Sequence, residues 1–189
     1  MSDAEKKPAV LVFAGPNGSG KSTIAKNLIP FGTYVNADDL KKEYNLTDLE
    51  AAQKADSLRR ILLEKGSDFS FETVLSTERN LLLLEKAKAQ GYEVQCIYVL
   101  TCDENINVAR VMARHAAGGH DVPEEKVRAR YHRALALLPR LPEICDKLLI
   151  YDNSDKPELI FSRQGAQSEI YPGSFWTETD IKKLLRLQQ

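Results

Sequence analysis

The stretch Gly15–Thr23, with the sequence GPNGSGKST, decides the fold of this chain. It fits the pattern G-x-x-x-x-G-K-[ST], and the apolar run Ala9–Gly15 before it predicts a buried strand. A helix is expected from Ser22 to Ile29, because Pro30 disfavours helical geometry in the residue before it. In such a loop, glycines let backbone N–H groups converge on phosphate oxygens, and the helix N-terminus adds a favourable dipole. The stretch therefore predicts the binding of nucleotide phosphates.

The residues of this loop have different expected roles. Lys21 is expected to reach the β- and γ-phosphates, and the Ser22 hydroxyl is expected to ligate Mg²⁺. The remaining nucleotide-binding residues of the loop are Gly15, Pro16, Asn17, Gly18, Ser19, Gly20 and Thr23. GTPases, motor ATPases and kinases share this phosphate cradle, so the reaction has to be argued from other residues.

Strand and helix patterns alternate along the rest of the chain. Further strands are predicted at Thr33–Asn36, Phe69–Leu75, Glu93–Leu100 and Leu148–Ser154. Further helices are predicted from a Thr47 and Glu50 capping box to Lys65, at Glu78–Gln90, at Glu104–Ala116, at Glu124–Leu138, and after a Thr177 cap to Gln189. This alternation predicts an α/β fold of the P-loop NTPase class, with a mostly parallel sheet and helices on both faces.

The segment 158–173 breaks the alternation and predicts a C-terminal β-hairpin around Gly165. With 189 residues and 43% hydrophobic content, the chain is expected to be a single domain with a real core. The 26 basic and 27 acidic residues nearly balance, which argues against a nucleic-acid or membrane partner. No apolar run approaches the ~20 residues of a membrane span. The three cysteines, without CxxC spacing, favour reduced thiols in a cytoplasmic protein.

Two carboxylates are candidates for chemistry. Ligands in open α/β sheets bind beyond the carboxyl ends of the strands, where Asp38 and Asp39 follow the second strand. Asp38 is expected to accept a proton from a substrate hydroxyl or to hold Mg²⁺ through water, whereas Asp39 is expected to cap the next short helix. Glu72 lies in a strand pattern and needs a partner there: metal, Lys21 or substrate hydroxyls, or alternatively a structural ion pair.

Polar residues after these strands narrow the class of enzyme. Thr73 and Ser76 are candidate substrate contacts, although Ser76 could equally cap a helix. Asp103 is expected to cap a helix, and no other Asp after the fourth strand would make a standard Walker B site. This argues against a motor ATPase and favours a small-molecule kinase, in which Ser22 and phosphates supply much of the metal shell. The spacing of the three histidines does not predict a zinc site.

Arginines cluster around a glycine pair, Gly118–Gly119. Arg110 and Arg114 share one face of the helix before it, and Arg130 and Arg133 neighbour each other on the helix after it. Arginine forks match phosphate oxygens, so residues 110–138 are interpreted as a helical lid over a triphosphate. The cluster consists of five of the chain's eleven arginines: Arg110, Arg114, Arg128, Arg130 and Arg133. The alternative is a solvated helix pair whose arginines form salt bridges with neighbouring glutamates.

The motifs GPNGSGKST, NADD, SFETVLS, RVMARHAAGGHDVPEEKVRARYHRAL and YDNS occur in this order between residues 9 and 154. In this order they resemble the zeta toxin family of P-loop kinases. The resemblance implies a nucleotide-kinase-like fold, ATP and Mg²⁺ as cofactors, and phosphorylation of the sugar of UDP-N-acetylglucosamine. A protein antitoxin is a further possible partner. The region after residue 154 departs from the larger toxins, so a different acceptor remains open.

The same resemblance assigns residues by position. Lys21, Asp38, Glu72 and Arg114 become the catalytic set, with Asp38 as base and Glu72 orienting the substrate. Arg110 and Arg114 are expected at phosphate, and Asn153 near the nucleotide base. Some contacts of the acceptor follow from position in the motifs and others from the interpretation of the lid. The predicted contacts are Asp38, Glu72, Thr73, Ser76, His120, Arg130 and Arg133. The alternative for His120 is that it only shapes its turn. Two other functions stay open, a nucleotide-dependent regulatory ATPase module and a polynucleotide-end kinase.

Overall fold

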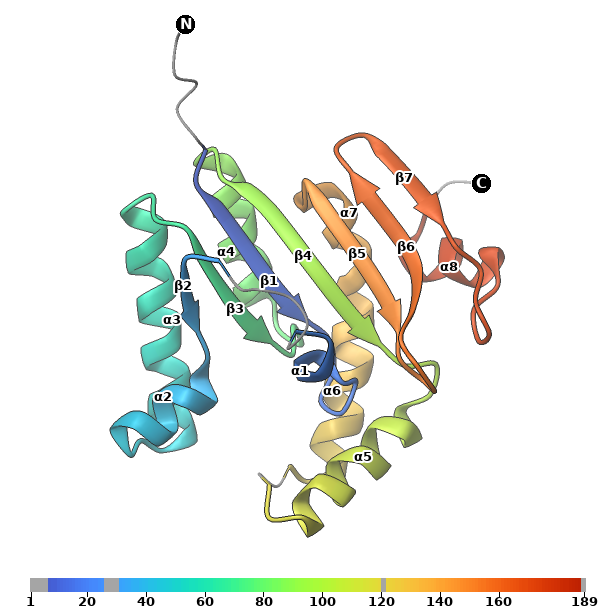
Figure 1. Ribbon diagram of the computed structural model, residues 1–189, viewed down its shortest axis with the longest axis horizontal. Coiled ribbons are helices and arrows are strands. Elements are labelled where there is room, and N and C mark those ends of the chain that lie inside the picture. Colours follow the sequence, from blue (N-terminus) through green and yellow to red (C-terminus); the bar gives the residue numbers. More distant parts are fainter. Residues whose placement is uncertain (1–6, 26–30, 120–121, 188–189) are drawn as a thin grey trace, which may run out of the picture.

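A seven-stranded sheet in the order β2-β3-β1-β4-β5-β6-β7 forms the centre of the molecule (Figure 1). The computed structural model describes residues 7–25, 31–119 and 122–187. Neighbouring strands from β2 to β5 are parallel, and β6 and β7 add an antiparallel hairpin at one edge. The strands are β1 (Ala9–Ala14), β2 (Thr33–Val35), β3 (Phe69–Thr73), β4 (Glu93–Leu100), β5 (Lys147–Asp152), β6 (Glu158–Gln164) and β7 (Gln167–Ile170).

Helices follow most of the parallel strands, as the alternating pattern predicts. They are α1 (Lys21–Ala25), α2 (Ala37–Tyr44), α3 (Asp48–Glu64), α4 (Glu78–Ala89), α5 (Glu104–Ala116), α6 (Glu124–Leu137), the 3-10 turn Leu138–Arg140, α7 (Leu141–Ile144) and α8 (Glu178–Leu185). The capping box at Thr47 and the cap at Thr177 are confirmed, and the Asp103 side chain accepts a hydrogen bond from the Asn105 backbone. The predicted end of α1, residues 26–30, lies outside the described residues.

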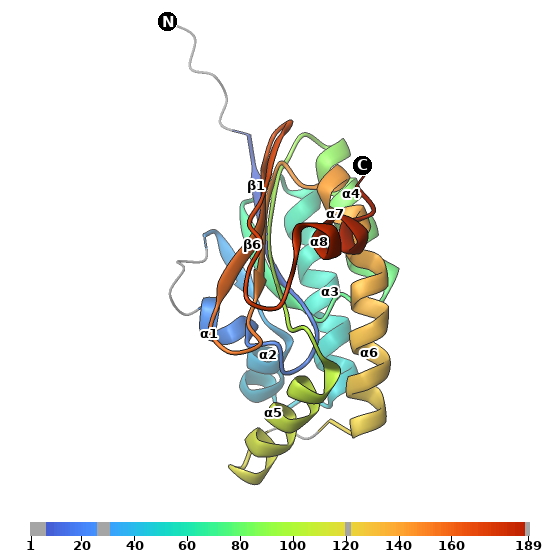
Figure 2. The same ribbon diagram turned by 90° about the vertical axis from the view of Figure 1, so that its right-hand side faces the viewer.

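The two faces of the sheet are covered unequally (Figure 2). Helices α3, α4, α6, α7 and α8 pack on one face, over the larger apolar core. In the described part of the chain the other face carries α1, over a smaller cluster that includes Phe13, Ile24 and Val99. Strand β1 is buried along its whole length, because it lies between β3 and β4. The prediction of helices on both faces is therefore correct in kind, but one face carries most of them.

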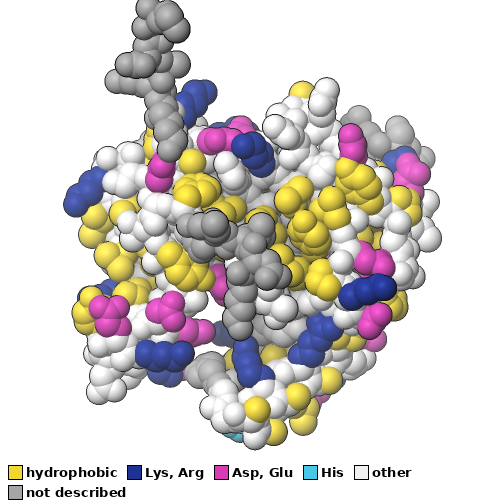
Figure 3. Space-filling model, in the orientation of Figure 1, with side chains coloured by type: hydrophobic (Ala, Val, Ile, Leu, Met, Phe, Trp, Pro, Cys, Tyr) yellow, Lys and Arg dark blue, Asp and Glu magenta, His cyan; other side chains and the backbone are white. Residues whose placement is uncertain are grey.

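Because β1 to β5 are parallel, their carboxyl ends all lie at one edge of the sheet. The Gly15–Thr23 loop follows β1 at this edge, and α2 and α5 begin beside it (Figure 1). Acidic and basic side chains gather along the same edge of the molecular surface (Figure 3). Among the described residues, no helix combines the length and the apolar composition needed to cross a bilayer.

One local prediction is wrong. Asp39 does not cap α2; Asn36 does, through a hydrogen bond from the Asp38 backbone N–H to its Oδ1 at 2.9 Å. The reason is that β2 ends at Val35, so Asn36 is the last residue with extended backbone geometry. Asp38 and Asp39 consequently lie in the first turn of the helix, where a negative charge is favourable.

Candidate active site

The phosphate-binding loop fits tightly against the strands beside it. Gly15 has φ +139°, and a side chain there would place its Cβ 2.0 Å from the carbonyl oxygen of Val99 on β4. Gly20 has φ +92°, and its Cβ would lie 2.2 Å from the amide nitrogen of Asn153. Both positions require glycine, because the backbone geometry and the neighbouring atoms exclude a side chain.

Two buried asparagines hold this loop in place. Asn153, directly after β5, donates from Nδ2 to the Ser19 carbonyl at 2.7 Å. Asn107 on α5 donates from Nδ2 to the Asn17 carbonyl at 2.6 Å, and its own Oδ1 accepts a hydrogen bond from the Thr101 hydroxyl. Sequence reasoning expected Asn153 near the nucleotide base and missed Asn107. Both side chains satisfy loop carbonyls, so they shape the cradle before any nucleotide binds.

Lys21 lies at the end of the loop, with its ammonium group turned back onto it. Its Nζ donates to the carbonyl oxygens of Gly15 and Pro16 at 2.7 and 2.9 Å. Burial lowers the pKa of Lys21 from its ordinary value to about 8, Glu72 opposes this shift, Arg114 adds to it and Asp38 opposes it. Glu72, Arg114 and Asp38, the other predicted catalytic residues, therefore lie within electrostatic reach of Lys21.

Glu72 at the end of β3 connects the sheet to the loop. Its Oε2 accepts a hydrogen bond from the Ser22 hydroxyl at 3.3 Å, and its Oε1 accepts one from the Tyr34 hydroxyl at 3.1 Å. The structure thus brings together the two residues that the sequence proposed as metal ligand and substrate ligand. Tyr34 was missed, because a tyrosine in a short edge strand carries no motif.

Three further residues predicted to contact the acceptor lie in α2, at the end of β3 and in the turn after β3. Asp38 is exposed in the first turn of α2. Thr73 uses its hydroxyl oxygen to accept hydrogen bonds from the Leu75 backbone at 3.0 Å and the Asn80 side chain at 2.7 Å. This fixes the turn after β3, in which Leu75 adopts φ 52°. Ser76 is partly buried in the same turn.

The five arginines separate into different roles. Arg110 donates to the carbonyl oxygens of Asn153 and Ser154 at 2.7 and 3.1 Å, so it holds the loop after β5. Arg128 forms ion pairs with Glu104 at 2.9 Å and Glu124 at 2.7 Å. For these two, the alternative of structural contacts describes the geometry better than contacts at phosphate.

Two arginines face the phosphate-binding loop. Arg130 on α6 donates to the Asn17 side chain at 3.3 Å. Arg114 on α5 lies close enough to Lys21 to lower its pKa.

Arg133 is exposed one turn further along α6. Helix α5 ends at Ala116, and the predicted contact His120 lies outside the described residues.

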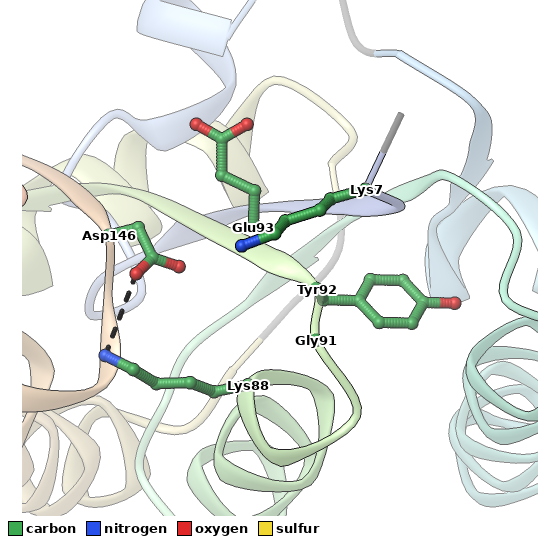
Figure 4. A pocket seen from close by; sticks show the side chains of 6 residues that line it. All are labelled: Lys7, Lys88, Gly91, Tyr92, Glu93 and Asp146. Atoms are coloured by element: carbon green, nitrogen blue, oxygen red, sulfur yellow. Dashed lines mark ion pairs between the residues drawn. The ribbon is translucent and has the colours of Figure 1, made fainter. Parts of the chain in front are cut away.

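A cavity of about 420 Å³ lies at the opposite end of the strands, beside the start of β4 (Figure 4). Its charged groups serve the fold: Asp146 accepts a hydrogen bond from the Val94 backbone at 2.9 Å and lies 3.8 Å from the Lys88 ammonium, which also donates to the Glu143 carbonyl. The cavity is lined by Lys7, Lys88, Gly91, Tyr92, Glu93 and Asp146. These contacts give the cavity a structural role, and the candidate active site lies at the loop edge.

The sequence model of the zeta toxin family matches residues 25–164. The chain belongs to the zeta toxin family. An uncharacterized protein of Haemophilus influenzae is 31% identical to it over 127 residues, which are 64% of this chain and 91% of that protein. The match begins at Ala25, the last residue of α1, and therefore does not include the phosphate-binding loop.

Solved structures of related proteins share the fold of this zeta toxin family member. A chain of the AvrRxo1-ORF1:-ORF2 complex with ATP superposes with a TM-score of 0.72 at 14% identity, over 96% of this chain and 64% of that chain. A chain of the PezAT toxin–antitoxin system of Streptococcus pneumoniae superposes with a TM-score of 0.59 at 19% identity, over 99% and 85% of the two chains. The chain thus shares the fold of these two proteins and spans about two thirds of the AvrRxo1 chain.

Proposed function

We propose that this protein is an ATP-dependent kinase that transfers the γ-phosphoryl group to a hydroxyl of a small molecule. The observation that carries the proposal is the hydrogen bond between Ser22 and Glu72, 3.3 Å long, directly beside Lys21. This bond supports the proposal because it holds a carboxylate beside the end of the cradle where the γ-phosphate is expected. A carboxylate in this place can serve the metal in switches and kinases alike; a kinase in addition has to orient a second substrate, and the exposed Asp38 at the same edge is the further group that this requires.

The cradle binds the triphosphate in this proposal. Backbone N–H groups of the loop and the start of α1 hold the phosphates, and Lys21 exchanges the carbonyls of Gly15 and Pro16 for phosphate oxygens. Phosphate beside Lys21 favours its charged form, which reverses the effect of burial. That ATP is the nucleotide is supported by the AvrRxo1 complex, which was solved with ATP.

The residues at the site fit a magnesium ion. The Ser22 hydroxyl and the Glu72 carboxylate supply two oxygen ligands that lie 3.3 Å apart. Mg²⁺ prefers one or two such ligands together with phosphate oxygens and water, and the described residues contain no group of three or more acidic, histidine or cysteine side chains around a metal position. When bound, the ion would neutralise charge on the phosphates.

Asp38 acts as the general base in this proposal. It is exposed in the first turn of α2, at the same edge as Glu72, and it influences the pKa of Lys21. An exposed carboxylate beside the γ-phosphate can accept the proton of an incoming hydroxyl while Glu72 orients that hydroxyl. Thr73, Ser76 and His120 remain predicted contacts of the acceptor.

Residues 110–138 form the lid in this proposal. Arg114 and Arg130 are the arginines proposed to contact phosphate, because Arg114 influences the pKa of Lys21 and Arg130 donates to the Asn17 side chain. Gly118 and Gly119 end α5 with backbone hydrogen bonds to His115 and Arg114, and they allow the lid to close. Arg133 is a second candidate on α6, whereas Arg110 keeps the loop after β5 in place.

The sugar of UDP-N-acetylglucosamine is our leading acceptor, on the strength of the family. The test incubates the protein with ATP, Mg²⁺ and a panel of nucleotide sugars and metabolites, followed by mass spectrometry. We expect one acceptor to gain the mass of a phosphate, and Lys21→Ala to abolish the gain. If ADP and inorganic phosphate are the only products, the protein is a hydrolase or a switch.

We further propose that a protein antitoxin binds this chain. The support is that PezAT is a toxin–antitoxin system and that AvrRxo1-ORF1 forms a complex with ORF2. Co-purification of the chain with the product of a neighbouring gene would test this, and loss of kinase activity in the complex is the expected result.

A further inference from the structure

Tyr34 and Glu72 form a hydrogen bond for which the proposed function gives no purpose. Tyr34 belongs to β2, which pairs with β3 at the edge of the sheet, and its side chain is 37% exposed. The Tyr34 hydroxyl donates to Oε1 of Glu72 at 3.1 Å, while the Ser22 hydroxyl donates to Oε2 at 3.3 Å. Each carboxylate oxygen therefore accepts a hydrogen bond from a hydroxyl, one on β2 and one on α1. The two bonds together fix the orientation of the Glu72 carboxylate.

The hydrogen bonds continue from Tyr34 to the helix that carries Asp38. Asn36 donates from Nδ2 to the Tyr34 hydroxyl oxygen at 3.3 Å. The Oδ1 of the same amide accepts from the Asp38 backbone N–H at 2.9 Å and so caps α2. One continuous chain of hydrogen bonds thus joins the first turn of α2 to Glu72 and then to Ser22 of the phosphate-binding loop.

The Tyr34 hydroxyl is hydrogen-bonded on both sides. It donates to Oε1 of Glu72 and accepts from the amide of Asn36, so its direction is set by two neighbours. The partly exposed ring contributes less to the core than a buried tyrosine would, so loss of the hydroxyl should leave the fold intact.

We propose that Tyr34 is a positioning residue, which holds the Glu72 carboxylate in its working orientation and in register with Asp38. The proposal rests on the proposed function, because that function gives Glu72 and Asp38 their roles. Groups that orient a reacting residue affect the rate through geometry, without touching the substrate.

The variant Tyr34→Phe tests this, because it keeps the ring and removes only the hydroxyl. We expect kcat to fall about tenfold, as is usual when an outer-shell hydrogen bond is removed, with the Kd for ATP within about twofold of wild type. The matched control is Tyr44→Phe, since Tyr44 is exposed on α2 and its ring faces Lys54. The control should leave kcat and Kd unchanged. An unchanged kcat for Tyr34→Phe would overturn the proposal.

A double-mutant comparison separates positioning from a merely structural effect. If Tyr34 acts through Glu72, Tyr34→Phe should lower kcat by less than about twofold in a Glu72→Gln background, against about tenfold in wild type. The same tenfold loss in both backgrounds would mean that Tyr34 acts by another route, and the proposal would be wrong.

A second readout does not depend on phosphoryl transfer. Binding of Mn²⁺ in the presence of a non-hydrolysable ATP analogue can be followed by water-proton relaxation. We expect Tyr34→Phe to weaken Mn²⁺ several-fold and Tyr44→Phe to leave it unchanged; equal affinities in wild type and Tyr34→Phe would contradict the role. If no acceptor is ever phosphorylated while Mn²⁺ binding follows this pattern, the kinase proposal fails and the role of Tyr34 in holding Glu72 stands.

Discussion

The two sides of the phosphate-binding loop are built differently. On the acceptor side, Glu72 is hydrogen-bonded to the loop through Ser22, and the chain of contacts continues to α2. On the lid side, five arginines are close in sequence, yet Arg110 and Arg128 are occupied by carbonyls and glutamates. The difference teaches that closeness in sequence does not predict what a charged side chain contacts, since two of the five arginines are bound to groups of the protein itself.

The largest effect is expected at Asp38. The substitution Asp38→Asn should lower kcat about 1,000-fold, because removal of a general base costs typically 10² to 10⁴. The Kd for ATP, measured by calorimetry, should change little. Asp39→Asn is the matched control in the same helical turn and should keep nearly full activity. Asp38→Asn activity within about threefold of wild type would exclude Asp38 as the base.

The lid side is tested by Arg114→Ala. Loss of a group that neutralises the transferring phosphoryl should lower kcat about 100-fold, and more than it weakens ATP binding. Steady-state kinetics and calorimetry separate the two effects. An unchanged kcat would remove Arg114 from the mechanism and leave Arg130 as the candidate that contacts the loop.

The pKa of Lys21 predicts a dependence on pH. The free protein loses the Lys21 proton above pH 8, so the affinity for ATP should fall about tenfold between pH 7 and pH 9. Lys21→Arg stays charged and should flatten this dependence. The stability of the nucleotide-free protein should change in the opposite direction to the ATP affinity. Its free energy of unfolding should rise between about pH 8 and pH 10.5, because in this range the unfolded chain binds more protons than the folded one. A flat affinity for wild type would contradict the lowered pKa.

The smallest effect is expected at Arg128, which sharpens the distinction within the lid. Arg128→Ala removes the partly exposed ion pairs to Glu104 and Glu124. Thermal unfolding should show a fall in Tm of no more than about 3 °C, and kcat should stay within about twofold of wild type. A large loss of kcat would place Arg128 at phosphate after all.

Much of the fold is predictable because its signals are local. The glycine loop, the capping residues Thr47, Asp103 and Thr177, and the apolar run of β4 each depend on a few neighbouring residues, and the structure confirms them. The cap of α2 is different. The sequence NADD offers several capping side chains, and only the end of β2 at Val35 selects Asn36.

The candidate site is predictable in its residues more than in their contacts. Lys21, Ser22 and Glu72 follow from motifs, and the structure brings them together. The partners of Arg110 and Asn107 lie 43 and 90 residues away in sequence, so no local pattern contains them. They depend on the order of strands in the sheet, which places the ends of β4 and β5 beside the loop.

The central claim is that phosphate moves from ATP to a small molecule at the edge that carries Glu72 and Asp38. The most direct measurement incubates the protein with ATP labelled in the γ-phosphate, Mg²⁺ and UDP-N-acetylglucosamine, and separates the products by chromatography. We predict label in the nucleotide sugar with wild type and almost none with Asp38→Asn. Label found only in inorganic phosphate, at equal rates in the two proteins and with every acceptor of the panel, would contradict the account.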